Sequence, residues 1–202
     1  MKTPLIFLLP LASALPVVLA LAEDKPATPK TPEASTTKME TGKVTKTDEE
    51  WRKKLTPEQF AITRRAGTER AHGAAYEKFE KEGEGTYYCV CCGGELFTSK
   101  EKFHSGCGWP SFYDSSKANN VLERVDNSHG MRRVETVCKR CEAHLGHVFE
   151  KEGYNTPTDR RFCINGAALV FVPKGGTPPK LEELSSPEVE KKKAEVKKEA
   201  GE

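Results

Sequence analysis

Two CxxC pairs constrain this chain more than any other feature of its sequence: Cys89 with Cys92, and Cys138 with Cys141. Each pair lies in a segment typical of a turn, and two glycines follow the first pair directly. Four soft thiolates on two such knuckles form a ligand set that tetrahedral zinc prefers. Because the knuckles lie far apart along the chain, one zinc ion would clamp two distant parts of the fold together. We expect structural zinc, with two disulfides as the alternative that an oxidising compartment would favour.

A competing metal site overlaps the second knuckle. Cys138, Cys141, His144 and His147 are spaced three residues apart and could in principle bind one ion. Four consecutive ligands at this spacing would require a tightly curled backbone, and they would leave the first knuckle without a role. The four-cysteine site is therefore the preferred interpretation.

The rest of the chain divides into a folded block and its two ends. Residues 1–22 contain a lysine, an apolar run and a small-residue cleavage site, the three parts of a secretory signal peptide. A retained membrane anchor is the alternative. Residues 23–50 and 174–202 are polar and charged, which predicts a disordered tether and a charged C-terminal tail. Residues 51–173 hold all seven cysteines and form the predicted domain, which we expect in the periplasm or secreted.

Charge is nearly balanced over the chain, with 32 basic and 30 acidic residues. No strong field would draw such a chain to nucleic acid, so we expect no nucleic-acid partner. We also expect a monomer.

The predicted domain opens with a helix. Thr56 is suited to the N-cap, Pro57 to the first helical position and Gln59 to a capping box. Leu55 and Phe60 are spaced as a hydrophobic staple, and the glycine at position 67 is a plausible stop.

Short strands follow this helix, separated by Gly, Pro, Asn and Asp. They are expected at Thr86–Val90, Val121–Val125, Met131–Val137, His147–Glu150 and Arg161–Val172. The sequence thus predicts a small, mainly antiparallel β domain with a helical N-terminal segment.

Three cysteines lie outside the predicted zinc ligands. Cys91 lies inside the first knuckle and is most simply a bystander. Cys107 is flanked by glycines, which predicts a mobile, exposed loop where a thiol can be reached. Cys163 lies in a strand-like run, and it is either a reactive thiol or a buried structural one.

The residues around Cys163 favour the reactive interpretation. The period of two puts Arg161, Cys163 and Asn165 on one face of the strand, while Phe162 and Ile164 face the core. A cation, a thiol and an amide on one face suit a site better than a core, and a nearby arginine favours the thiolate.

Histidines and aromatic residues complete the candidate site. His144 and His147 follow the second knuckle, where a bound metal would hold acid/base groups rigidly. Trp109 and Phe112 offer an aromatic wall beside Cys107 that could receive a substrate.

Seven segments in one order make the chain similar to the B-type methionine-R-sulfoxide reductases. They are GTE at 67–69, the CxxC at 89–92 with Leu96-Phe97, SGCGWPSF at 105–112, SHGM at 128–131, the CxxC at 138–141, HLGHVF at 144–149 and RFCIN at 161–165. The resemblance covers about Leu55 to Val172 and departs at Arg70–Glu84 and at Cys91. It implies two antiparallel sheets in an open, barrel-like arrangement with short N-terminal helices, and a structural zinc on the two knuckles.

The resemblance also implies an activity and a role for each site residue. By this resemblance, Cys163 is the catalytic cysteine and Cys107 the resolving cysteine. His144, His147 and Asn165 are active-site polar groups. Arg161 is the arginine near the nucleophile, and Trp109 forms the wall that receives the substrate methyl. The implied reaction reduces methionine-R-sulfoxide, free or in oxidised proteins, through a Cys163 sulfenic acid and a Cys107–Cys163 disulfide. A thioredoxin-like reductant would then restore the thiols. The rivals are a zinc-stabilised binding module without catalysis and a general thiol-disulfide oxidoreductase.

Overall fold

A computed structural model of the chain describes residues 42–180 and Leu184. All of them belong to one compact unit, Lys38–Glu202. The predicted signal peptide or anchor at 1–22, and most of the predicted tether and tail, lie outside the described residues. Within the described part of the chain, no helix combines the length and apolarity that a membrane crossing requires.

Three short helices open the described chain: α1 (Asp48–Lys54), α2 (Pro57–Arg65) and α3 (Ala74–Lys81). The predicted capping box of α2 is confirmed, because the Thr56 hydroxyl accepts from the Gln59 N–H and the Gln59 side chain accepts from the Thr56 N–H. The predicted stop is one residue too late. Ala66, with φ of 52°, takes the left-handed position that ends the helix.

The predicted tether extends too far into the domain. Helix α1 begins at Asp48, where Thr47 and Glu50 form a second capping box, and Trp51 is only 1% exposed. Before it, the Val44 N–H donates to the Arg140 carbonyl oxygen at 2.7 Å. The folded part therefore begins before position 51, because a capped helix buries its tryptophan.

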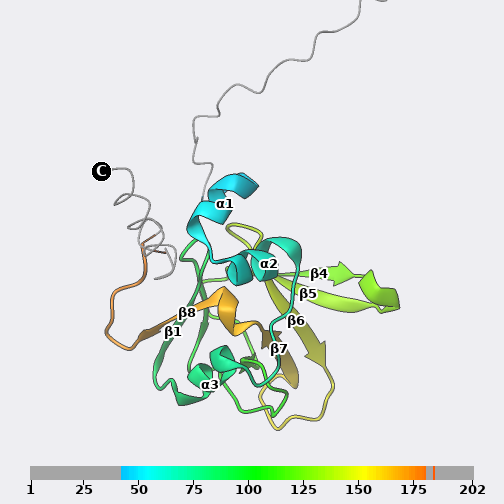
Figure 1. Ribbon diagram of the computed structural model, residues 1–202. Coiled ribbons are helices and arrows are strands. Elements are labelled where there is room, and N and C mark those ends of the chain that lie inside the picture. The colour runs from blue at the N-terminus through cyan, green and yellow to red at the C-terminus, as the bar shows by residue number, and fades with distance from the viewer. Residues whose placement is uncertain (1–41, 181–183, 185–202) are drawn as a thin grey trace, which may run out of the picture. The chain divides into compact units, whose positions relative to one another are not determined.

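Over residues 42–180, eight strands form two antiparallel sheets (Figure 1). The strands are β1 (Gly85–Cys89), β2 (Glu95–Thr98), β3 (Ser111–Phe112), β4 (Val121–Asp126), β5 (Arg133–Cys138), β6 (His144–Glu150), β7 (Arg160–Ile164) and β8 (Leu169–Pro173). One sheet has the order β2-β1-β8, and the other has β3-β7-β6-β5-β4. The sheets do not close into a barrel. The predicted fold class, mainly β with two antiparallel sheets and short N-terminal helices, is confirmed.

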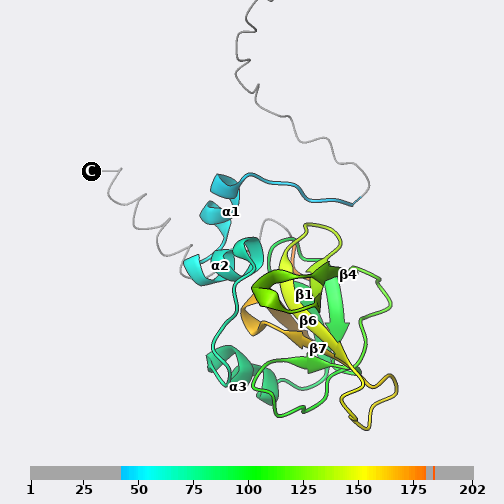
Figure 2. The ribbon, with the colours of Figure 1, turned by 90° about the vertical axis from the view of Figure 1, so that its right-hand side faces the viewer.

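Two views show how the helices are placed on this framework. Helices α1 and α2 lie next to each other, α3 lies apart from them at the opposite end of β1 and β8, and the β4–β5 hairpin projects to one side (Figures 1 and 2). Buried aromatic residues fill the interior, and the ring of Phe97 stacks on that of Phe112 with centroids 4.3 Å apart.

The predicted strand Arg161–Val172 is two strands in different sheets. A short 3₁₀ turn at Gly166–Ala168 separates β7 from β8. At this break the Asn165 side chain accepts from the Glu69 N–H and donates to the Leu145 carbonyl oxygen, both at 3.0 Å. The chain thereby leaves one sheet and enters the other, which a continuous apolar pattern cannot reveal.

The beginning of the predicted tail packs against the domain. A Cβ added to Gly93 would lie 2.8 Å from the carbonyl oxygen of Pro179 and 3.2 Å from a methyl of Leu184, which is 6% exposed. This part of the segment therefore covers the first knuckle rather than extending freely.

Candidate active site and metal site

The two knuckles come together as predicted. The sulfurs of Cys89, Cys92, Cys138 and Cys141 all lie within 4.8 Å of one another, and all four residues are buried. The sulfurs of Cys89 and Cys141, and those of Cys92 and Cys138, lie 3.6 Å apart and all four cysteines are free, so the two-disulfide alternative is not formed. Four converging thiols shielded from water can hold a metal ion, and their softness and number fit tetrahedral zinc.

The competing histidine site is not formed. His144 Nδ1 lies 2.7 Å from a Glu135 carboxylate oxygen, and His147 Nε2 lies 2.8 Å from an Asp126 carboxylate oxygen. Both histidines thus belong to carboxylate pairs. Cys91 is fully buried beside the cluster, so the thiol interpreted as a bystander is shielded from solvent.

Strand pairing builds the second sulfur site. In the β3-β7-β6 part of the sheet, Ser111 lies opposite Cys163 on one side and His147 lies opposite it on the other. The Cys107 loop then brings its sulfur to 3.8 Å from that of Cys163. Both cysteines are partly exposed, unlike the five buried ones. The sheet therefore presents two accessible thiols beside an imidazole.

Hydroxyl groups surround Cys107. The Ser105 hydroxyl donates to its sulfur at 3.1 Å, and the Ser111 hydroxyl lies 3.5 Å away. The hydrogen bond with Cys163 is the main cause that lowers the pKa of Cys107 to about 4, and the two serines add to it. The same hydrogen bond raises the pKa of Cys163 far above its usual value. The pair therefore loses its first proton readily and holds its second tightly.

The raised pKa of Cys163 differs from the expectation that Arg161 would favour its thiolate. Its guanidinium does lower the pKa of Cys163, but by less than the hydrogen bond with Cys107 raises it. Both Nε and Nη2 of Arg161 donate to the two carboxylate oxygens of Glu152 at 2.8 Å. Because the cation is already paired with a carboxylate, it does not outweigh the effect of the Cys107 hydrogen bond on the pKa of Cys163.

A strand irregularity puts the two histidines on the same side. The β5–β6 register shifts between Thr136 and Val137, and the two imidazole rings lie 5.5 Å apart. Gly146, between the histidines, has to be a glycine. A Cβ there would lie 2.1 Å from the Cys163 carbonyl oxygen. Close contact of β6 with β7 thus holds His147 beside Cys163.

Burial distinguishes the histidines. His144 is 4% exposed, and desolvation lowers its pKa although Glu135 opposes the change. Its Nε2 is buried with no hydrogen-bond partner. His147 is less buried, and its partner Asp126 also accepts from Arg133 at 2.7 Å.

Asn165 and Trp109 meet at Glu69, a residue to which the sequence assigned no role. The Glu69 carboxylate accepts from the backbone N–H groups of Gly166 and Ala167, and its carbonyl oxygen accepts from Trp109 Nε1 at 3.2 Å. Asn165 holds the Glu69 N–H, as described above. These contacts make Glu69 the anchor of the loop that orients the tryptophan, and they place Asn165 in that anchor.

Phe112 is not part of an exposed aromatic wall. It is fully buried, since β3 alternates Ser111 toward Cys163 and Phe112 toward the core, where Phe97 stacks on it. The expectation that Phe112 contacts substrate is corrected by this alternation, whereas Trp109 remains partly exposed.

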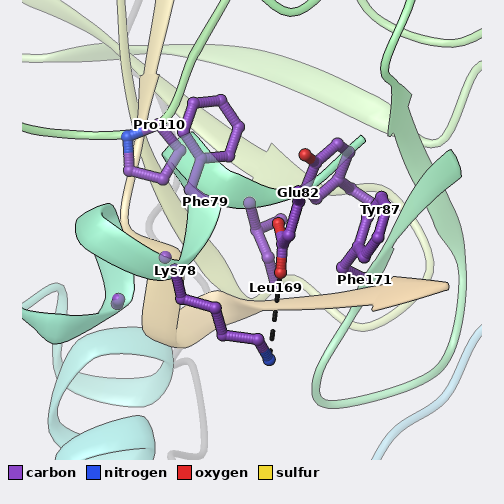
Figure 3. Close-up of a pocket in the computed structure, with 9 residues that line it drawn as sticks. Lys78, Phe79, Glu82, Tyr87, Pro110, Leu169 and Phe171 are labelled. Atoms are coloured by element: carbon purple, nitrogen blue, oxygen red, sulfur yellow. Dashed lines mark ion pairs between the residues drawn. The ribbon is translucent and has the colours of Figure 1, made fainter. Parts of the chain in front are cut away.

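A separate cavity of about 170 Å³ lies beneath α3 (Figure 3). Aromatic rings of Phe79, Tyr87 and Phe171 line it, with the ion pair of Lys78 and Glu82 beside them. None of the cysteines or histidines lines this cavity. The chemistry-bearing residues are grouped on the β3-β7-β6 sheet instead.

Several partners in the site could not be read from the sequence. They are Ser105, Ser111, Asp126, Glu135 and Glu152, each within hydrogen-bonding distance of a predicted site residue. Strand register and a loop conformation create these contacts, so spacing along the chain gives no signal for them.

Comparison with known proteins gives a consistent result. The SelR domain family matches residues 55–173. The chain is 47% identical over 131 residues to the "Peptide methionine sulfoxide reductase MsrB" of Chromohalobacter salexigens, covering 65% of this chain and 96% of that protein. Proteins of the same name from Synechococcus sp. (strain RCC307) and Acinetobacter baumannii are 50% and 52% identical over 127 and 128 residues. The matches cover 63% of this chain and 90% and 89% of those proteins.

Proposed function

The chain belongs to the B-type methionine sulfoxide reductases, oxidoreductases that reduce methionine sulfoxide, and on this premise we propose that Cys163 is its nucleophile and Cys107 its resolving cysteine. The observation that carries this assignment is the 3.8 Å approach of the two sulfurs beside His147. We also propose that the enzyme is selective for the R epimer. Its substrate would be the free amino acid or the residue in oxidised proteins.

The first step forms a sulfenic acid. Cys163 sulfur attacks the sulfoxide sulfur, its thiol proton ends on the oxygen, and the oxygen is transferred to the cysteine. Methionine leaves with two more electrons than the sulfoxide had. The thiolate is the attacking form, so the proton that leaves Cys163 is available for the oxygen, which must be protonated.

An imidazolium can assist that proton transfer. When each histidine donates one N–H to its carboxylate, the other ring nitrogen carries a proton only in the charged form. Burial lowers the pKa of His144 and so disfavours its charged form. His147, which lies opposite Cys163, is therefore assigned to pass a proton to the oxygen and to take up the thiol proton of Cys163 in return, with His144 as a neutral neighbour.

The second step converts the sulfenic acid into a disulfide, which an external dithiol then reduces. Cys107 sulfur attacks the sulfenic sulfur of Cys163, the disulfide forms, and the hydroxyl leaves as water after taking a proton from an imidazolium or from solvent. A thioredoxin-like dithiol then reduces the disulfide and becomes oxidised itself. The partly exposed position of both cysteines supports access for such a partner.

Zinc is the metal that best fits the four-cysteine cluster. Cys89, Cys92, Cys138 and Cys141 would hold it, and the ion would join the two knuckles without entering the reaction. The ligated thiolates would also be protected from the oxidants that the enzyme meets.

We propose an exported, monomeric enzyme. The apolar run and small-residue site within residues 1–22 support export to the periplasm or secretion. The reductant would then be a thioredoxin-like protein outside the cytosol, since such compartments are oxidising.

The test is reduction of R- and S-methionine sulfoxide in a model peptide by the full domain with dithiothreitol. The wild type should reduce the R epimer, and Cys163→Ser should lose this activity completely. Cys107→Ser should still form about one equivalent of methionine per enzyme in a single turnover, because it lacks only the second step. A folded, zinc-loaded wild type that is inactive on both epimers would contradict the proposal and favour a binding module.

A further inference from the structure

The β6–β7 loop, residues 151–159, has a defined conformation of its own. One carboxylate oxygen of Asp159 accepts from the backbone N–H groups of Gly153 and Tyr154, both at 3.0 Å. The Lys151 N–H donates to the Asp159 carbonyl oxygen at 3.1 Å and closes the loop at its base. The loop can therefore hold its side chains in fixed positions.

This loop contacts the strand that carries Cys163. Glu152 receives two hydrogen bonds at 2.8 Å from Arg161, which lies two residues before that cysteine. The Arg161 guanidinium also lies 5.9 Å from the ring centre of Tyr154. One side of the loop is thus attached to the nucleophile's strand.

The same loop contacts the segment that carries Cys107. The Tyr154 hydroxyl donates to the Ser105 carbonyl oxygen at 3.3 Å, and its ring meets that of Phe103 edge-on with centroids 5.1 Å apart. Ser105 in turn donates through its hydroxyl to Cys107 sulfur, and accepts from the Cys107 N–H at 3.4 Å. Ser105 therefore contacts both Tyr154 and Cys107 and links the two residues.

Neighbouring glycines make this contact important. Gly106, directly before Cys107, has φ of 74° and an added Cβ would meet nothing within 4 Å. The loop is open there, so few contacts fix its conformation. Tyr154 supplies one such contact just before the glycine, while the packing of Gly108 on His72 supplies another just after Cys107.

We propose that Tyr154 is a positioning residue for the resolving step, which holds the Cys107 loop within reach of the Cys163 sulfenic acid. The inference rests on the proposed function, since it needs Cys163 as nucleophile and Cys107 as resolving cysteine. Tyr154 takes no part in methionine formation. It acts on the next step, in which Cys107 sulfur bonds to Cys163 sulfur and water leaves.

The experiment uses the full chain, reduced and mixed with one equivalent of R-methionine sulfoxide peptide in a rapid quench. Tyr154→Phe keeps the ring on Phe103 and removes only the hydroxyl. Methionine should form at the wild-type rate, while disulfide formation slows by roughly two- to tenfold, the range expected for one lost hydrogen bond. Dimedone should then label more Cys163 sulfenic acid in the variant than in the wild type.

Thr158→Val is the matched control. The Thr158 hydroxyl donates to the Tyr113 carbonyl oxygen at 2.5 Å and accepts from the Arg160 N–H at 3.3 Å, so this change removes hydrogen bonds of the same loop without touching the Cys107 segment. Disulfide formation at the wild-type rate in this variant would support a specific role for Tyr154.

Two results would overturn the inference alone: normal disulfide formation in Tyr154→Phe, or equal slowing in Thr158→Val. A wild type that forms no methionine would instead overturn the proposed function, and the inference with it.

Discussion

The four-cysteine cluster and the Cys107–Cys163 pair bring sulfurs together at almost the same distance, 3.6 Å and 3.8 Å. Their surroundings differ in every other respect. The cluster residues are at most 3% exposed, whereas both members of the pair are partly open to solvent. Proximity alone therefore does not decide what a thiol does.

The difference lies in the number of thiols and in what surrounds them. Four converging sulfurs complete a tetrahedral ligand set and leave no position for a substrate. Two sulfurs beside hydroxyls, imidazoles and open space can exchange a proton, accept an oxygen atom and close a disulfide. On the proposed function, one chain thus contains an inert sulfur site and a reactive one, and burial distinguishes them.

The largest loss of stability should come from removing one ligand of the four-cysteine cluster. Cys138→Ser removes one of four ligands, and a structural zinc contributes about 10–16 kcal/mol of apparent binding in small zinc domains. We expect loss of zinc and of most of the folding free energy, measured by metal content and thermal unfolding. Cys91→Ser, also buried but outside the ligand set, should keep its zinc. Equal zinc loss in both variants would remove the distinction between ligand and bystander.

A smaller loss of stability should come from forcing apart β6 and β7, the strands that carry His147 and Cys163. Gly146→Ala places a methyl 2.1 Å from the Cys163 carbonyl oxygen, so β6 and β7 must move apart at about 3 kcal/mol or more. Gly153→Ala is the control, because its φ of 79° also strains an alanine but the added methyl meets nothing within 4 Å, and it should cost about 1 kcal/mol. Urea unfolding measures both. Similar losses would show that close strand packing does not hold the site together.

The smallest effect concerns protonation at the reactive site. Burial lowers the pKa of His144, so the folded protein binds a proton there less readily than the unfolded chain, whose histidines titrate near pH 6.5. Above that pH both states are neutral and stability is unaffected. As pH falls below about 6.5, stability should decrease by up to about 1.4 kcal/mol per pH unit. His144→Gln should lack this component of the decrease in urea titrations at several pH values, and an unchanged slope would contradict it.

Local signals in the sequence predicted the parts of the fold that depend on neighbours in the chain. The capping residues before Pro57 and the alternation around Phe162 both describe what the structure contains. Strands β2 and β3 were missed because they are short and mostly buried, so they show no alternation. The break after Ile164 was missed because its cause is a contact with Glu69, far away in sequence.

The candidate site follows the same division. Residue types identified Cys107, Cys163 and the two histidines, and the structure brings all four to one part of the sheet. Their partners arise from strand pairing, which no spacing along the chain encodes. Phe112 was assigned to the wrong face for this reason: its strand consists of two residues, too few for a period to appear.

The most direct test of the account is a map of all seven cysteines after one turnover. The reduced, metal-loaded protein is treated with one equivalent of R-methionine sulfoxide peptide, alkylated after denaturation, and analysed by mass spectrometry, with the metal measured before denaturation. We expect one disulfide, between Cys107 and Cys163, with one zinc retained and the other five cysteines as thiols. A disulfide that includes Cys89, Cys92, Cys138 or Cys141, or zinc release during turnover, would contradict the division into an inert and a reactive sulfur site.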